Sequence, residues 1–381
     1  MSFDTKPCII KWCPRKEFNV DRYMTYLQHS IDSRQLTNGG PLQQVLAARL
    51  REITNSTLDI LPAASGTAAL HALCAGWSLK FGRPLRWATQ AFTFPPSMQG
   101  PLAEAIVIDA DAHSCGPSLS LLSQHIDIID GIVVTNVFGT QTDVLAYEQW
   151  CRKHNKLLIF DNAATPVGVS PDGRCIHDIG NGAIISLHET KPIGRGEGGA
   201  IFASPEISKF VKQAMNFGFQ ETGSGRRGSR LCSNYRASDF AAAVILDHLD
   251  TVIEFNWAAR YTDLAAVAVD ALERHNLSLK YELKAPTIPS CLLIQLRNDM
   301  TGSVDSIIET LNGSPYFIEV KHYYRPLVEE HLAPEAWRTY SSTICLPFHL
   351  DLTAQDIEYM VQSLVAVLGA CVTKLSKKLT I

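Results

Sequence analysis

The sequence lacks the patterns that mark several common classes of protein. Its 10 cysteines form no C-x-x-C pair, and its 12 histidines show no metal-ligand spacing. We therefore expect neither a disulfide framework of the secreted type nor a metal site. No apolar run approaches the roughly 20 residues that span a bilayer, and residues 1–15 hold no hydrophobic stretch long enough for a signal peptide. These absences predict a soluble, cytoplasmic protein with reduced cysteines and no membrane partner.

Positive charge is not concentrated on any one stretch of the chain. The formal net charge is −4, and lysines and arginines are spread along the sequence apart from a short cluster at Arg226, Arg227 and Arg230. A protein that tracks nucleic acid needs a continuous basic stripe. We therefore expect no nucleic-acid partner, and we interpret the cluster as a solvated or anion-facing loop.

Between residues 58 and 203 the sequence contains short apolar runs that alternate with amphipathic stretches. This alternation predicts βαβ units and a mostly parallel sheet covered on both faces by helices. The predicted strands are Leu58–Ala63, Leu85–Thr89, Glu104–Asp109, Gly131–Val137, Lys156–Asp161, Ala183–Leu187 and Ala200–Ala203. The predicted helices among them are Thr67–Leu79 and Val144–His154. Because the last two strands lie close together in sequence, we expect one strand to run against the others.

After residue 204 the predicted helices become longer, and a second group of strands follows. The helices are Pro205–Asn216, Ser238–Phe255, Asn256–His275, Val304–Leu311 and Ala354–Leu368, and the strands are Leu279–Lys284, Cys291–Leu296 and Tyr316–His322. A chain of 381 residues is long enough for two domains. We predict a large domain over residues 1–255 and a small α/β domain over residues 256–381.

One lysine stands between a predicted strand and a glycine-rich turn. Lys191 lies in the segment Ser186–Gly196, which continues into Glu197-Gly198-Gly199. An amine on a short loop after a buried strand suits a lysine that forms a Schiff base. Taken alone, the same pattern also fits an exposed loop lysine.

Two further segments carry groups that a phosphate-bearing cofactor needs. Ser65–Leu70 follows a predicted strand and opens a helix, whose free N–H groups and positive dipole end can bind a phosphate. The alternative is an ordinary helix start with Ser65 as N-cap. Asp161 ends a strand at the edge where open α/β sheets bind ligands, so that it can pair with a protonated ring nitrogen or simply stabilise a turn.

Together with these features, short motifs along most of the chain resemble those of the DegT/DnrJ/EryC1/StrS family of sugar aminotransferases. In chain order, the matching motifs are Leu36–Pro41, Ser65–Leu70, Thr93-Phe94, Asn136–Gly139, Ser186–Lys191, Gly196–Gly199, Asn216–Phe219, Asn234–Asp239 and Leu346-Pro347. Their order and spacing, more than any single motif, carry the resemblance. It implies a fold-type I transferase dependent on pyridoxal 5′-phosphate, with a mostly parallel seven-stranded sheet in the large domain and a smaller C-terminal α/β domain.

The resemblance also implies roles for individual residues. Lys191 would form the Schiff base and carry a proton, and Asp161 would keep the pyridine nitrogen protonated. The residues implied to bind the cofactor are Gly66, Thr67, Phe94, Asp161, Ser186 and Lys191 from one subunit and Asn234 from the other subunit of a two-fold dimer. The candidate substrate contacts are His188, Tyr235, Arg236 and Tyr324, whose alternative roles are loop-shaping for His188 and exposed loop positions for the others. Phe94 would stack on the cofactor ring unless it is a core aromatic.

One position departs from the family pattern. The family usually has Gln or His three residues after the aspartate, near the phenolic oxygen of the cofactor, whereas this chain has Ala164. Alanine cannot donate a hydrogen bond. Asn162 or Thr165 can take its place, or the oxygen is left to the Schiff-base nitrogen and water.

The activity implied by the resemblance is transfer of the amino group of L-glutamate to a keto sugar. The implied acceptor is a nucleotide-linked 4-keto- or 3-keto-6-deoxyhexose, used to make amino sugars for O-antigen, another polysaccharide or a glycosylated metabolite. One alternative is a sugar dehydratase on the same fold, but such relatives carry histidine at the position of Lys191. The other is a regulatory homologue without turnover, which only Ala164 favours.

Overall fold

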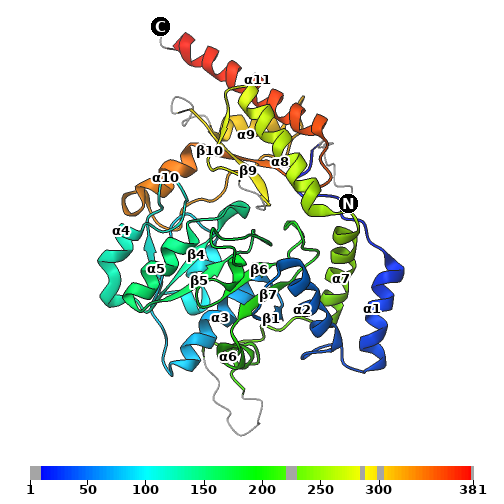
Figure 1. Ribbon diagram of the computed structural model, residues 1–381. Helices are drawn as coiled ribbons and strands as arrows, with labels where there is room; N and C mark the ends of the chain where they lie inside the picture. The colour runs from blue at the N-terminus through cyan, green and yellow to red at the C-terminus, as the bar shows by residue number, and fades with distance from the viewer. Residues whose placement is uncertain (1–9, 220–229, 284–287, 298–303, 379–381) are drawn as a thin grey trace, which may run out of the picture.

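A seven-stranded sheet forms the centre of the chain (Figure 1). The computed structural model describes residues 10–219, 230–283, 288–297 and 304–378, so Arg226 and Arg227 of the basic cluster lie outside the described residues. The strands, in spatial order, are β1 (Asp59–Ala63), β7 (Gly199–Ala203), β6 (Ala183–Ser186), β5 (Leu157–Asp161), β4 (Gly131–Thr135), β2 (Trp87–Gln90) and β3 (Ile106–Ile108). All seven predicted strands are thereby confirmed, with small shifts at their ends.

The strand β7 runs against both of its neighbours, β1 and β6, whereas the other pairs are parallel. This confirms the predicted reversal near the end of the sheet. The connection from β6 to β7, residues 187–198, contains no helix that could cross the sheet as a parallel connection requires. Because β7 is antiparallel to both neighbours, β1 points the same way as the central strands.

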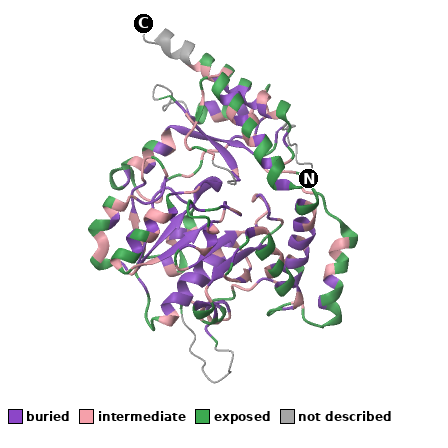
Figure 2. Cartoon of the chain, viewed as in Figure 1, coloured by how far each residue is buried: buried purple, intermediate pink, exposed green. Residues whose placement is uncertain are grey.

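The two faces of the sheet are covered by different helices, as the alternation of side chains along each strand demands. Ile132 and Val134 of β4 point into one buried cluster, and Val133 between them points into the other. The first cluster includes residues of α2 (Pro41–Thr54), α5 (Val144–His154) and α7 (Asp239–Glu254), and the second includes residues of α3 (Gly66–Lys80) and α6 (Pro205–Met215). Figure 2 shows the strands buried between helices whose outer faces are exposed.

A second, three-stranded antiparallel sheet lies beyond the large one (Figure 1). Its strands, in spatial order, are β10 (Thr343–Pro347), β9 (Cys291–Gln295) and β8 (Ser278–Leu279). The accompanying helices are α8 (Trp257–Arg274), α9 (Val304–Asn312), α10 (Pro334–Ser341) and α11 (Ala354–Lys378). The helix α1 (Val20–Asp32) packs beside α7 at the side of the large sheet. The sequence did not predict α1, α2, α10 or β10. Most of the predicted strand Leu279–Lys284 is wrong, because only Leu279 belongs to β8, residues 280–283 form no strand, and Lys284 lies outside the described residues.

The predicted strand Tyr316–His322 is wrong. The segment forms only isolated bridges, from Ile318 to Ile10 and from Lys321 to Cys345. The side chain of Asn312 takes the place of a strand partner, because its Oδ1 accepts the N–H of Val320 at 2.7 Å and its Nδ2 donates to the Val320 carbonyl at 3.2 Å. An alternating sequence can therefore satisfy its backbone without a continuous ladder.

Two negative findings concern the described residues alone. No helix among them combines the length and apolar character needed to cross a bilayer. Nor do their His, Cys, Asp and Glu side chains form a group of three or more that could hold a metal ion.

Candidate active site

The strand registers bring several predicted site residues to one edge of the large sheet. Gly199 lies opposite both Ala63 and Ser186, so the ends of β1 and β6 flank the start of β7. One strand further, Asp161 at the end of β5 is paired with Thr135 at the end of β4. This edge is formed by the carboxyl ends of the parallel strands, where open α/β sheets bind ligands.

The start of α3 is packed tightly against this edge. A Cβ atom added to Gly66 would lie 2.8 Å from the Cβ of Ser186, and one added to Gly199 would lie 2.4 Å from the carbonyl oxygen of Ser65. Only glycine at these two positions allows the helix start to approach the strands so closely. The Ser65 hydroxyl caps the helix by accepting the N–H of Ala68 at 3.0 Å, as one interpretation of the sequence predicted.

The same helix start offers donors to an anion. The N–H groups of Gly66 and Thr67 have no acceptor within the helix because of their position in its first turn. They point toward the positive end of the helix dipole, and the Ser186 hydroxyl is adjacent to Gly66. The two readings of Ser65–Leu70 are therefore compatible: one N–H is capped by Ser65, and others remain for a phosphate.

Asp161 is buried among neutral groups. Its Oδ1 accepts the N–H of Ala163 at 3.0 Å, and the hydroxyl of Thr135 donates to the carboxylate. Thr135 is held in turn by Thr93, whose hydroxyl donates to it at 2.8 Å. Burial is the main influence on Asp161 and raises the pKa of its carboxyl above the ordinary value, while the two hydrogen bonds and the charge of Lys191 oppose the shift.

Lys191 lies close enough to Asp161 for their charges to interact. Burial of the amine lowers the pKa of Lys191, and the negative charge of Asp161 opposes this shift, as does the thiol of Cys291 on β9. The lowered pKa increases the fraction of neutral amine, which is the form that acts as nucleophile and base. Cys291 was not predicted as a site residue, because nothing in its apolar surroundings distinguishes it from a core cysteine.

His188 is bound up in the loop that carries Lys191. Its Nδ1 accepts the N–H of Thr190 at 3.2 Å and lies 2.9 Å from the Thr190 hydroxyl. Because Nδ1 accepts, the proton of the neutral ring is on Nε2, which lies 3.4 Å from Glu197 Oε1. These contacts support the loop-shaping role for His188, and its contact with a substrate stays a prediction.

Three aromatic side chains from segments outside the strands lie together, and one of them, Tyr324, is close enough to Asp161 for their charges to interact. The ring of Tyr324 stacks on Phe138 at a centroid distance of 4.9 Å and lies 6.0 Å from the ring of Phe94. Phe94 is 53% exposed, so it is not a core aromatic and its face is available. Burial is the main cause that raises the pKa of the Tyr324 phenol, and the neighbouring side chains of Cys291, Cys345 and Asp161 act in the same direction.

The two candidates for the role left open by Ala164 are both engaged elsewhere. The Asn162 amide group lies 3.0 Å from Nδ1 of His177 and accepts the side-chain N–H of Asn136 at 2.6 Å. The Thr165 hydroxyl donates to the Asn136 carbonyl at 3.1 Å. This network fixes the turn after Asp161. His177 was missed because its partners are distant in sequence and no local pattern marks it.

The segment Asn234–Arg236 lies at the flank of the helix start. The Tyr235 carbonyl accepts the N–H of Ala64 at 2.9 Å, and its phenol donates to the Leu231 carbonyl at 3.4 Å. The Arg236 guanidinium donates to Oδ1 of Asn234 at 2.9 Å and to Oδ1 of Asn216 at 2.7 Å. Asn234 itself is exposed, and its action on a second subunit stays a prediction, as do substrate contacts of Tyr235, Arg236 and Tyr324.

Comparison with known proteins identifies similar sequences. A family profile described as the DegT/DnrJ/EryC1/StrS aminotransferase family matches residues 19–365. Protein Rv3402c of Mycobacterium tuberculosis is 29% identical over 225 residues, which cover 56% of this chain and 53% of that protein, so the match spans about half of its length. A dTDP-4-amino-4,6-dideoxy-D-glucose transaminase of Shigella dysenteriae is 23% identical over 370 residues, covering 91% of this chain and 95% of that enzyme.

Solved structures share the fold over almost the whole chain. The crystal structure of DesI in the presence of its TDP-sugar product superimposes with a TM-score of 0.81 at 19% sequence identity, covering 97% of each chain. At this level of identity the likeness establishes the fold, a fold-type I transferase, and leaves the substrate to be argued from the site.

Proposed function

The chain belongs to the DegT/DnrJ/EryC1/StrS aminotransferase family, and on that premise we propose that it moves the amino group of L-glutamate to a nucleotide-linked keto sugar. The proposed acceptor is a 4-keto- or 3-keto-6-deoxyhexose, and the proposed cofactor is pyridoxal 5′-phosphate. The observation that carries this proposal is that the Lys191 amine and the buried carboxyl of Asp161 lie close enough for their charges to interact at the carboxyl edge of the large sheet.

The donor and acceptor groups at the sheet edge fit this cofactor. The helix start at Gly66 and Thr67, with the hydroxyl of Ser186, suits a phosphate group. Among the described residues, Asp161 accepts hydrogen bonds from Ala163 and Thr135 and from no cation, so its carboxylate can accept the N–H of a protonated ring nitrogen. Phe94 offers an exposed ring face on which a planar ring can stack.

The chemistry divides between the cofactor and the chain. When bound, pyridoxal phosphate supplies a carbonyl that condenses with amines and a ring that accepts electrons. Lys191 provides the neutral amine that holds the cofactor and afterwards moves a proton between the substrate carbon and solvent or cofactor. Asp161 stabilises positive charge on the ring nitrogen, because a buried carboxylate interacts strongly with a charge it contacts directly.

Ala164 bears on how the site is tuned. Because Asn162 and Thr165 are held by His177 and Asn136, the phenolic oxygen of the cofactor is left to the lysine nitrogen and water in our proposal. Loss of turnover would not follow from this, since Lys191 and Asp161 remain in place.

The proposal is tested by adding pyridoxal phosphate to the purified protein and recording its visible absorbance. We expect a band that L-glutamate bleaches, and amino transfer to at least one member of a panel of dTDP-, UDP- and GDP-linked keto sugars. A bound cofactor that does not respond to glutamate would favour the regulatory homologue. Sugar dehydration without amino transfer would favour the dehydratase.

We also propose that the active unit is a dimer in which Asn234 completes the site of the other subunit. Its exposed position in one chain leaves it available for this role. The test mixes two inactive variants, Lys191→Ala and Asn234→Ala, under conditions that exchange subunits. A mixed dimer contains one site free of both substitutions, so about one quarter of the wild-type activity should return. No recovery after demonstrated exchange would place Asn234 in its own subunit's site.

A further inference from the structure

The loop that carries Lys191 is held from behind by a second lysine. We define the Lys191 loop as residues 188–196. The ammonium of Lys16 donates to the carbonyl oxygens of Glu189 at 2.5 Å, Lys191 at 2.9 Å, and Gly194. An ammonium has three N–H donors, and all of them are used on this loop.

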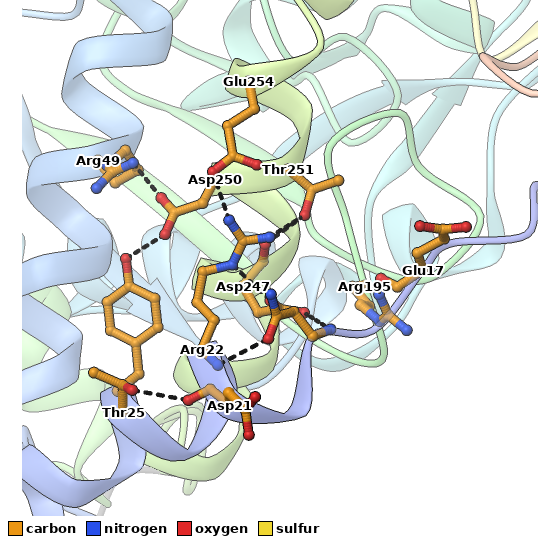
Figure 3. A network of polar contacts seen from close by, with 12 residues as sticks. Glu17, Asp21, Arg22, Thr25, Arg49, Arg195, Asp247, Asp250, Thr251 and Glu254 are labelled. Atoms are coloured by element: carbon orange, nitrogen blue, oxygen red, sulfur yellow. Dashed lines mark hydrogen bonds and ion pairs between the residues drawn. The ribbon is translucent and has the colours of Figure 1, made fainter.

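An arginine of the loop makes the reverse contacts. The Arg195 guanidinium donates to the backbone carbonyl of Lys16 at 2.9 Å and to that of Glu17 (Figure 3). Its guanidinium carbon also lies 5.0 Å from the ring centre of Phe18. The segment Lys16–Phe18 and the Lys191 loop are therefore joined by side chains from both partners.

The segment is itself fastened to α7 (Figure 3). Nε of Arg22 lies 2.9 Å from Asp247 Oδ1, and its Nη1 lies 2.7 Å from Glu254 Oε1. The backbone N–H of Asn19 also donates to Asp247, at 3.3 Å. Because Asp247 is buried, its bonds to Arg22 and Asn19 are shielded from water, whereas Glu254 is exposed. The Lys191 loop is thus connected through Lys16 and its neighbours in the chain to α7.

The surroundings of Lys16 decide its charge at neutral pH. Burial is the main influence and lowers its pKa to about 8. Among the described residues, the charged or titratable groups that face it are Glu189, Cys13, Asp351, Arg195, His248 and His349. Of these, Glu189 has the largest effect and favours the ammonium, as the three carbonyl acceptors also do. Below about pH 8 Lys16 therefore keeps the proton that its third hydrogen bond needs.

We infer that Lys16 is a positioning residue, which fixes the backbone of the Lys191 loop so that the Lys191 amine is held at Asp161. This inference rests on the proposed function of Lys191. The backbone carbonyl of Lys191 is one of the three acceptors, so a shift of Lys16 is transmitted to the residue that carries the amine. The hydrogen bonds of the Lys16 ammonium to described residues all go to the loop, so we infer that it acts on the site through the loop.

A cavity next to Lys16 makes the inference testable by chemical rescue. A cavity of about 470 Å³ is lined by Lys16, by Pro192 of the Lys191 loop and by Tyr261. Shortening Lys16 would leave the three carbonyl oxygens facing this space, and a small organic cation can enter it. Methylammonium has three N–H donors and matches the end of the lysine side chain.

The test compares Lys16→Met with Lys11→Met as a control. Lys11 is an exposed lysine that precedes the segment Lys16–Phe18, and its ammonium lies 3.7 Å from Glu319. In the protein without cofactor, hydrogen exchange of the loop amides should become about tenfold faster or more in Lys16→Met, because bonds to a charged donor are lost. In the protein with pyridoxal phosphate, the pH at which the visible band is half changed should rise by about half a unit or more. The reason is that a loosened loop lets water solvate the protonated form of the Lys191 nitrogen. In Lys16→Ala, whose shortened side chain leaves room for methylammonium, the added cation should reverse both changes, and Lys11→Met should show neither change.

The inference is overturned if Lys16→Met matches Lys11→Met in loop exchange and in the pH midpoint. Failure of the proposed function gives a different result, because the wild type would then show no visible band. Hydrogen exchange of the loop amides would still test the role of Lys16, since it is measured without cofactor. If Lys16→Met does not fold, exchange of the wild type at pH 7 and pH 9.5 replaces it, after correction for the intrinsic pH dependence. Selective loosening of residues 188–196 at the higher pH supports the inference, and unchanged protection refutes it.

Discussion

Each of the two edges of the large sheet carries an aspartate, and the pKa values of the two carboxyls are shifted in opposite directions. At the carboxyl edge, Asp161 is buried beside neutral donors, and its pKa is raised. At the amino edge, Asp130 precedes β4 and accepts hydrogen bonds from Arg83 at 2.8 and 2.9 Å and from Arg86 at 3.1 and 3.2 Å. The bonds from Arg83, and then those from Arg86, hold the pKa of Asp130 far below its ordinary value.

This difference indicates that Asp161 serves the activity of the protein and Asp130 its folding stability. Asp130 has its cationic partners within the chain, so its charge is already compensated and contributes to folding. Asp161 is buried, and no cation among the described residues is hydrogen-bonded to it, an arrangement that costs free energy unless a ligand supplies the cation. We therefore expect substitutions at the carboxyl edge to change activity and those at the amino edge to change stability.

The largest effect is expected from Lys191→Ala. The variant loses both the amine that holds the cofactor and the base that moves the proton, so amino transfer should fall by at least about 10³-fold. The free energy of unfolding of the cofactor-free protein should not fall, because a buried amine with a lowered pKa is removed. Amino transfer and urea denaturation are measured in parallel, with the exposed Lys153→Ala as control. Amino transfer retained by Lys191→Ala would show that the carboxyl edge of the sheet does not carry the chemistry.

A smaller loss is expected from Asp161→Asn, which keeps the shape and removes the charge. Loss of a charge-assisted hydrogen bond to the cofactor ring corresponds to about a 10- to 150-fold loss of amino transfer. The native pKa of Asp161 is raised, so the native protein binds more protons than the unfolded chain, and stability falls as pH rises above the ordinary carboxyl value. Asp161→Asn has no carboxyl at this position and therefore does not lose stability in this way as pH rises. The cofactor-free variant should therefore gain stability over the wild type as pH rises from 4 to 7, whereas Asp263→Asn on α8 should not. If the cofactor-free Asp161→Asn variant were less stable than the wild type at pH 7, the buried Asp161 carboxylate would not be unfavourable, contrary to our interpretation.

Gly66→Ala probes the helix start at the same edge. The added Cβ would lie 2.8 Å from Ser186 Cβ, and the helix must move away from the strand to relieve the overlap. Overpacking of this kind costs about 1–3 kcal/mol, and we expect affinity for pyridoxal phosphate to fall on the order of tenfold. Gly369→Ala on α11 is the control, since a Cβ there meets no atom within 4 Å. Cofactor titration followed by fluorescence measures both, and equal affinities would show that the helix start does not bind the phosphate.

The sequence predicted those parts of the molecule whose signal is local. The seven strands follow from short apolar runs, and the places of Asp161 and Ser65 follow from the ends of such runs. The lysine was predicted from its motif because strand, turn and glycines occur within a few residues of each other. These features share a property: each is encoded by neighbours in the chain.

The parts that were missed depend on residues far apart in the sequence. Lys16 lies 178 residues from Gly194, and Arg83 lies 47 residues from Asp130. Nothing near Lys16 distinguishes it from a surface lysine, and its role is set by backbone carbonyls, which every residue possesses. The wrong strand at Tyr316–His322 has the same origin, since Asn312 satisfies the backbone of Val320 through a side chain. Pattern alone identifies groups with chemistry but not the contacts that hold them.

The smallest effect, and the counterpart to Asp161→Asn, is expected from Asp130→Asn. At pH 7 the variant should lose on the order of 1 kcal/mol in free energy of unfolding, since the guanidinium groups of Arg83 and Arg86 are half exposed and water screens the pairs. Amino transfer should be unchanged. Because the native pKa of Asp130 is lowered, its stabilising effect is fully present above the ordinary carboxyl pKa and disappears as pH falls below about 4. On acidification the wild type should therefore lose stability relative to Asp130→Asn, whereas it should gain stability relative to Asp161→Asn. Urea denaturation between pH 3 and pH 7 measures it, and a difference that grows toward low pH would show that the two edges do not differ as we describe.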